Sequence, residues 1–303
     1  MLVALLWGAT FTTAKAAVND VPPFTVALLR FGLATLVLLP IFVNDRRGSR
    51  LLPSSLPAWC SLVLLGATAV FGYNALFFGG LSHAPSSDSI LLIPTANPIW
   101  TALFAALILG ETISARLRIG MIVAFLVMVL VLVGGPSASF GGERLIGSLM
   151  FIVAASVFGL SHVIGRIATQ HVSPIGATTF AGAIGSLMLL PFAIVEGGFG
   201  DLARADLGFW LAMGFISFVG TALGYILWYR GVQKLGAGNT AFYTNLIPLF
   251  GLTFSAVFLN EYPTPLQVLG GLVMLGAVVW VTRSRPVPET STGPVTVATE
   301  GSR

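Results

Sequence analysis

The chain has 303 residues, of which 56% are hydrophobic and only 9% are charged. A soluble domain carries about 25% charged residues, so this chain has too little polar side-chain surface for a soluble fold. Lys and Arg number 15 against 11 Asp and Glu, but these basic residues fall in short loops, which indicates membrane topology and not nucleic-acid binding. The single Cys60 excludes an internal disulfide and a multi-cysteine metal site, and three scattered His give no metal-ligand spacing.

Ten apolar stretches follow one another along the chain, each near the roughly 20 residues that a helix needs to cross a bilayer. In order, they cover residues 2–18, 24–43, 58–80, 89–109, 119–135, 145–164, 174–195, 207–228, 237–259 and 266–281. None alternates polar and apolar residues as the strands of a membrane β-barrel do, and the links are too short to form a soluble domain. The sequence therefore predicts an all-α polytopic membrane protein with ten transmembrane helices.

The first stretch, residues 2–18, has the length of a signal peptide as well as that of a span. It lacks the basic segment that precedes the apolar part of a signal peptide, and its residues recur later in the chain. We therefore interpret it as the first transmembrane helix.

Two sets of residues recur at a nearly constant spacing. Trp7-Gly8, Lys15, Pro23 and Leu39-Pro40 correspond to Phe158-Gly159, Arg166, Pro174 and Leu190-Pro191 at an offset of 151 residues, and Pro98, Glu111 and Gly120 correspond to Pro248, Glu261 and Gly270 at an offset of 150. With five spans in each copy, the second copy starts on the opposite side of the membrane, which gives two inverted five-helix repeats, as in alternating-access transporters. We expect a first repeat over residues 1–135, a second over 136–283, and a disordered cytoplasmic tail over 284–303.

The distribution of basic residues predicts the orientation. With the N-terminus inside, eleven basic residues lie on the cytoplasmic side and only two, Arg144 and Arg204, lie in outer loops. This asymmetry is the one described by the positive-inside rule. We therefore expect a multi-pass protein of the cytoplasmic (inner) membrane with both termini in the cytoplasm.

Three ionisable residues, Lys15, Arg30 and His162, fall within the predicted spans, and no Asp or Glu does. A charge inside the membrane is costly and marks a candidate functional site. Lys15 and Arg30 could attract an anionic group such as an amino-acid carboxylate, or extend their long side chains toward the interface. His162 could move protons or hydrogen-bond a neighbouring helix. Because proton-coupled carriers often relay protons through a buried carboxylate, its absence argues against a proton-coupled exporter of cationic drugs.

Aromatic and amide side chains supply most of the remaining polarity of the spans. The candidate substrate-binding residues are Trp7, Tyr73, Asn74, Phe77, Asn97, Trp100, Tyr225, Trp228, Tyr243 and Asn245. Asn97 and Asn245 lie shortly before Pro98 and Pro248, and a proline inside a membrane helix frees a backbone carbonyl that can line a cavity. Such an uncharged, aromatic-lined site suits a zwitterionic or weakly polar solute, although Tyr225 and Trp228 would equally fit an interfacial aromatic belt.

Two pairs of opposite charges follow from the inverted repeat. Lys15 and Glu261 come to lie near the outer face, and Arg166 and Glu111 near the inner one. We hypothesise that each pair is a latch that closes its own face, because a partly buried ion pair loses strength when water enters. The alternative is that each charge anchors its helix end at the interface.

The segment Trp7-Gly8-x-x-Phe11-x-x-x-Lys15 opens a series of recognisable blocks. Together with Pro22-Pro23-Phe24, Leu29-Arg30-Phe31, Asn97-Pro98 before Leu109-Gly110-Glu111, and Ile247-Pro248 before Asn260-Glu261, it resembles the drug/metabolite transporter (DMT) superfamily and most of all its EamA-like ten-helix exporter branch. The resemblance covers about residues 2–282. It implies an exporter of small metabolites, amino acids or related compounds first, with sugars or nucleotide-sugars as the alternative. The related small multidrug-resistance proteins depend on a glutamate in their first helix, which residues 2–18 lack, so a multidrug exporter is less expected.

No nucleotide-binding loop, catalytic triad or metal-ligand cluster occurs in the sequence, so we expect neither enzyme activity nor a cofactor. A membrane-embedded enzyme would need convergent nucleophiles or acids inside the spans, and a channel would show rings of charges or carbonyls from repeated subunits. The expected partners are a small-molecule substrate and the lipid bilayer, with no nucleic acid. We expect a monomer or a weak homodimer.

Overall fold

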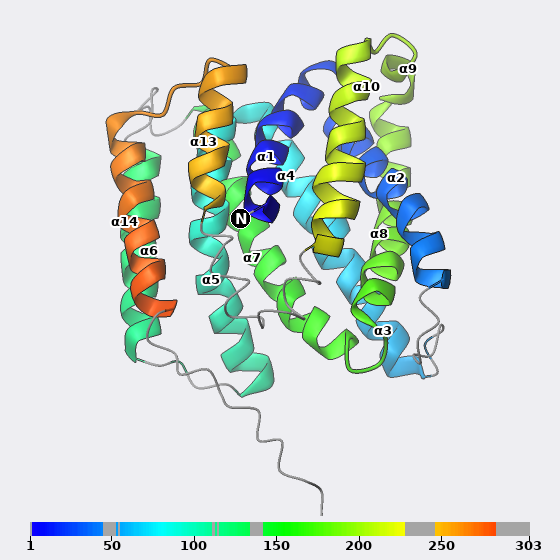
Figure 1. Ribbon diagram of the computed structural model, residues 1–303, viewed down its shortest axis with the longest axis horizontal. Coiled ribbons are helices and arrows are strands. Elements are labelled where there is room, and N and C mark those ends of the chain that lie inside the picture. Colours follow the sequence, from blue (N-terminus) through cyan, green and yellow to red (C-terminus); the bar gives the residue numbers. More distant parts are fainter. Residues whose placement is uncertain are drawn as a thin grey trace, which may run out of the picture.

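A computed structural model describes residues 2–44, 53, 55–110, 113, 115–133, 142–227 and 246–282. All regular secondary structure in these ranges is helical (Figure 1). Six of the helices are long and apolar enough to cross a membrane. The prediction of an all-α polytopic membrane protein is therefore confirmed, whereas ten transmembrane helices and the inverted repeat remain predictions.

The helices follow one another with short connections. The first part of the chain contains α1 (Leu2–Asp20), α2 (Pro23–Asn44), α3 (Leu56–Leu65), the π-helix η1 (Gly66–Gly72), α4 (Tyr73–His83), α5 (Ser86–Leu109) and α6 (Ala115–Val133). The second contains α7 (Glu143–Ala168), α8 (Pro174–Glu196), α9 (Phe199–Leu202), α10 (Leu207–Gly214), the π-helix η2 (Phe215–Leu223), α13 (Ile247–Phe258) and α14 (Pro265–Thr282). Helices α3, η1 and α4 form one continuous span, Leu56–His83, and α10 and η2 belong to another, Leu207–Leu227.

The helices expose large apolar side chains on their outer surfaces. Val195 is 88% exposed, Leu56 76% and Leu207 73%. In water such a surface would aggregate, but a helix that is apolar all round is typical of a membrane span. We therefore expect the exposed apolar surface of the bundle to face lipid.

The bundle is built from helix pairs that are distant in sequence. Helix α2 packs along α8, α5 along α7, α1 along α13, and α6 along α14 at one edge (Figure 1). Glycines allow the closest of these approaches. A Cβ atom on Gly185 of α8 would lie 2.4 Å from the Val70 Cβ and 2.8 Å from the Gly66 carbonyl oxygen of η1. Small residues at such crossings permit the close packing that holds membrane helices together in lipid.

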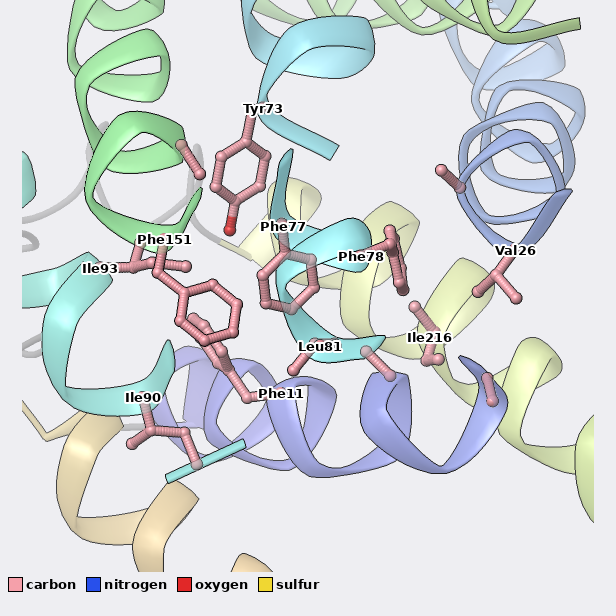
Figure 2. Packing of buried hydrophobic residues seen from close by; sticks show 14 of the residues in the cluster. Phe11, Val26, Tyr73, Phe77, Phe78, Leu81, Ile90, Ile93, Phe151 and Ile216 are labelled. Atoms are coloured by element: carbon pink, nitrogen blue, oxygen red, sulfur yellow. The ribbon is translucent and has the colours of Figure 1, made fainter. Parts of the chain in front are cut away.

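The centre of the bundle is a cluster of aromatic rings (Figure 2). Phe77 is 1% exposed, and its ring lies 5.5 Å from that of Phe11 and 5.0 Å from that of Phe78. Tyr73 stacks on the other side of Phe77, with ring centroids 5.7 Å apart. Because lipid is as apolar as these rings, their contribution comes from close packing more than from removal of water.

Candidate functional site

Two π-helices interrupt the regular hydrogen bonding of their spans, and polar side chains bind the carbonyls at both. Asn74 Nδ2 donates to the Val70 carbonyl at 2.7 Å and to the Ala69 carbonyl at 3.3 Å, both in η1. In η2, Thr221 Oγ1 donates to the Ile216 carbonyl, five residues earlier, at 2.9 Å. Wide turns of this kind are frequent at functional sites.

Arg30 of α2 connects the two π-helical segments. Its Nε donates to Thr221 Oγ1 at 3.1 Å, and its Nη1 donates to Asn74 Oδ1 at 3.4 Å. We call Arg30, Asn74 and Thr221 the Arg30 bridge. The guanidinium carbon also lies 5.1 Å from the centroid of the Phe31 ring and 6.0 Å from that of Phe78, within the range of cation–π attraction. The sequence predicted Arg30 and Asn74 as site residues but gave no reason to select Thr221.

Aromatic residues of the predicted site lie near this bridge in two groups. Trp7 donates from Nε1 to the Gly220 carbonyl at 3.0 Å, and its ring meets Tyr225 edge-on at 5.8 Å. Tyr73, which immediately precedes Asn74, stacks on Phe158 of α7 at 4.5 Å. Phe77 belongs to the buried aromatic cluster described above.

A second polar group lies where α5 meets α7. Thr101 Oγ1 donates to Asn97 Oδ1 at 3.2 Å and lies 3.4 Å from His162 Nδ1, while the His162 ring lies 4.6 Å from that of Phe158. Asn97 Nδ2 is buried and has no hydrogen-bond partner among the described residues. Trp100, one turn along α5, stacks on Phe104 at 6.1 Å. The site residues on α5 and α7 are thus brought together, and Phe158 and Thr101, which the sequence analysis did not select, join them.

Lys15 and Glu261 both bind the turn between α4 and α5, from two sides. Lys15 Nζ donates to the carbonyls of Leu81 and Ala84, the latter at 3.2 Å. The Glu261 carboxylate accepts from the Ser86 backbone N at 2.8 Å and from Ser86 Oγ at 2.7 Å. The two charges therefore lie at one end of the bundle but are not bonded to each other here, and the latch remains a prediction.

Four sequence-predicted residues, Trp228, Tyr243, Asn245 and Glu111, lie outside the described residues. Arg166 is exposed in the last turn of α7. Of the proposed pair Arg166 and Glu111, the structure therefore describes only Arg166, and the pairing stays a prediction.

The expectation that no carboxylate lies within the spans is wrong, because α5 begins at Ser86 and includes Asp88 in its first turn. Asp88 is completely buried. Its Oδ2 accepts from Arg144 Nε at 2.8 Å and Ser148 Oγ at 3.0 Å, and its Oδ1 accepts from Arg144 Nη2 at 3.1 Å and Gln267 Nε2 at 2.8 Å. We call these four residues the Asp88 cluster; it ties α5, α7 and α14 together.

The predicted span begins at residue 89, so Asp88 falls one position outside it. The signal in the sequence is the run Ser86-Ser87-Asp88-Ser89 after Pro85, since an acidic residue in the first turn is typical of a helix N-terminus. Because α5 contains a buried carboxylate, the lack of one no longer speaks against proton coupling. No group of three His, Cys, Asp or Glu in the described part of the chain is placed to hold a metal ion.

Comparison with known proteins identifies the family to which this chain belongs. The profile of the EamA-like transporter family matches residues 1–133 and 145–283. "Uncharacterized transporter YyaM" of Bacillus subtilis is 31% identical over 280 residues, which cover 91% of this chain and 90% of that protein. A "Probable terminal-alkyne amino-acid exporter" of Streptantibioticus cattleyicolor is 25% identical, over 93% of this chain and 92% of its own. A solved crystal structure, 19% identical, superposes with a TM-score of 0.62 over 93% of this chain and 94% of its own, which supports the fold.

Proposed function

Since the chain belongs to the EamA-like transporter family, we propose that it is a secondary transporter that exports amino acids or related small metabolites by alternating access. The family and the apolar helices make it a multi-pass membrane protein of a transporter family. The substrate class, the mechanism and the direction of transport are the proposed part.

The observation that carries this proposal is the Arg30 bridge with its aromatic neighbours. In otherwise apolar spans, a guanidinium, an amide and a hydroxyl meet beside two π-helices, with Trp7 and Tyr225 close by. Polar groups inside a membrane bundle are expensive and mark substrate pathways. Amides and aromatic faces are the groups that would hold a small zwitterion, and one relative is described as an amino-acid exporter.

Two glycine contacts support the inverted repeat on which alternating access depends. A Cβ atom on Gly8 of α1 would lie 2.8 Å from the Phe250 Cβ and 2.9 Å from the Gly251 N of α13. A Cβ atom on Gly159 of α7 would lie 2.9 Å from the Trp100 Cβ and 2.9 Å from the Thr101 N of α5. These are the pairs that the two repeats would relate, since the glycines are 151 residues apart and their contacts 150. One helix of each repeat would thus pack against a helix of the other repeat. Rocking of the repeats against each other would then open the substrate site to one side of the membrane and close it to the other.

Counterflow in proteoliposomes tests the function. Vesicles with purified protein are loaded with one unlabelled solute, and uptake of its labelled form is followed for a panel of L-amino acids, sugars and nucleotide-sugars. We expect accumulation of at least one amino acid and none in vesicles that contain heat-unfolded protein. Accumulation of a sugar or nucleotide-sugar alone would replace the amino-acid proposal with the alternative substrate class of the same fold.

A further inference from the structure

Arg30 carries a positive charge in the interior of the bundle, and no carboxylate of the described residues binds it. Its two hydrogen-bond partners, Thr221 and Asn74, are neutral. The ionisable groups close enough to influence its charge are the phenols of Tyr73 and Tyr225.

Arg144 and Asp88 form the one salt bridge between described residues, and three of the described carboxylates at helix ends are bound to groups other than Arg30. Asp88 accepts from Arg144, Glu261 accepts from Ser86, and Glu196 accepts from the backbone N of Thr25. The sequence from 228 to 245, which follows η2, contains no Asp or Glu at all. No acidic residue of the described chain therefore neutralises Arg30.

The guanidinium also keeps hydrogen-bonding capacity in reserve. It has five N–H donors in a planar fork, and the described residues accept from Nε and Nη1 only. Nη2 has no hydrogen-bond acceptor among the described residues. Arg30 as a whole is partly exposed. The edge of the fork that carries Nη2 is therefore available to a further acceptor.

An uncompensated cation in a low-dielectric interior is strongly unfavourable unless a partner neutralises it for part of the working cycle. An arginine whose free edge is accessible is suited to a planar carboxylate, which it binds through two parallel hydrogen bonds. We propose that the Arg30 guanidinium is the receptor for the carboxylate of the transported solute, a proposal that rests on the exporter function above and makes the substrate a monoanionic carboxylate or an amino acid.

The charge count of the interior separates this ligand from the alternative. Lys15 is occupied by the carbonyls of Leu81 and Ala84, and Arg144 by Asp88. Arg144 is paired with Asp88, and Glu261 lies close enough to attract Lys15, whereas no described carboxylate acts on Arg30, which leaves one positive charge for one negative charge of the solute. A nucleotide-sugar, which carries two phosphate charges, would leave one of them without a cation.

Arginine modification tests the site without knowledge of the natural substrate. Purified protein in detergent is treated with phenylglyoxal, and modified arginines are located by mass spectrometry. Arg204, which is exposed, is the positive control, and Arg144, which is 12% exposed and paired with Asp88, is the negative control. The probes are the L-amino acids, their amides, hexanoate and hexanamide. We expect modification of Arg30 that at least one carboxylate prevents and its amide does not, while Arg204 reacts equally throughout.

The affinity of the protecting acid is then compared in wild type and Arg30→Gln by the concentration dependence of thermal stabilisation. Loss of charge-assisted hydrogen bonds should weaken acid binding roughly 10–100-fold, to the level of the amide. Arg30→Lys should retain part of the preference for the acid. If Arg30→Gln does not fold, the wild-type protection pattern decides by itself.

The proposal is overturned if Arg30 does not react in folded protein, if no carboxylate protects it, or if acid and amide protect it equally. Undiminished amino-acid counterflow by Arg30→Gln would keep the exporter function and remove this site from it. Protection by hexanoate without any amino-acid counterflow would keep the carboxylate site and remove the amino-acid exporter function.

Discussion

Replacing Asp88 by Asn tests whether the Asp88 cluster holds α5, α7 and α14 together. The substitution preserves shape but removes the negative charge and turns one acceptor oxygen into an NH₂ donor. In either orientation of the amide, this donor faces an Arg144 nitrogen, because Arg144 donates to both Asp88 oxygens. At least one charge-assisted hydrogen bond is therefore replaced by a donor–donor contact, and Arg144 loses the ion pair with the Asp88 carboxylate.

The magnitude follows from burial. Asp88 is 0% exposed and Arg144 12%, so water compensates little of the loss. Removing one partner of a buried ion pair costs about 3–5 kcal/mol. We expect Asp88→Asn to lower the free energy of unfolding by that amount, measured by titration with a denaturing detergent and followed by tryptophan fluorescence.

Glu143→Gln is the matched control, since Glu143 precedes Arg144 directly and is exposed. Its effect should remain below about 1 kcal/mol, as for most surface substitutions. The double variant Asp88→Asn/Arg144→Met should recover part of the loss, because the Arg144 charge is then removed together with the carboxylate that it binds. A loss below about 1 kcal/mol for Asp88→Asn, or strictly additive effects in the double variant, would refute the role assigned to the pair.

Three further outcomes are expected. Gly185→Ala should destabilise the protein by about 1–3 kcal/mol, because the new methyl group overlaps Val70 and the Gly66 carbonyl. The control is Gly32→Ala in α2, which has nothing within 4 Å of the new methyl group and should be neutral or slightly stabilising. Equal melting temperatures for the two variants would contradict the close crossing of α8 and η1. Trp100→Ala and Asn97→Ala should each reduce counterflow more than they reduce thermal stability, since the buried Asn97 Nδ2 has no partner in the described part of the chain; equal losses in both measurements would assign these residues to packing. A reporter that is active only in the periplasm, fused after Arg285, should give no signal, and a strong signal there would reverse the orientation.

The spans could be predicted from the sequence because length and hydrophobicity alone define them. Predicted residues 24–43 and 174–195 differ from α2 and α8 by at most one residue at each end. The π-helices could not be predicted in this way. A change from i+4 to i+5 hydrogen bonding leaves no mark in a stretch whose residues are nearly all apolar, and it depends on the tertiary partners of Asn74 and Thr221.

The candidate site was predicted where a residue is unusual for a membrane. Arg30 stands out by its charge and Asn74 by its amide. Phe158 does not, because a phenylalanine in lipid and one stacked on Tyr73 look alike in sequence. Asp88 lies outside the predicted span because that span begins three residues after the start of α5. Helix ends are the part of a helix whose position is least well defined.

The pairing of α6 with α14 at the edge of the bundle (Figure 1) has a consequence for biogenesis. Residues 134–264 separate the two helices. At a synthesis rate of about 5–20 residues per second, α6 waits roughly 7–26 s for the helix that covers its flank. Ile122, Phe125 and Leu126 on α6 are 57–60% exposed even in the finished protein, so during this interval lipid or the insertion machinery must shield a still larger apolar surface. A ribosome that stalls before residue 265 would leave α6 in the membrane without the helix that packs along it in the finished protein.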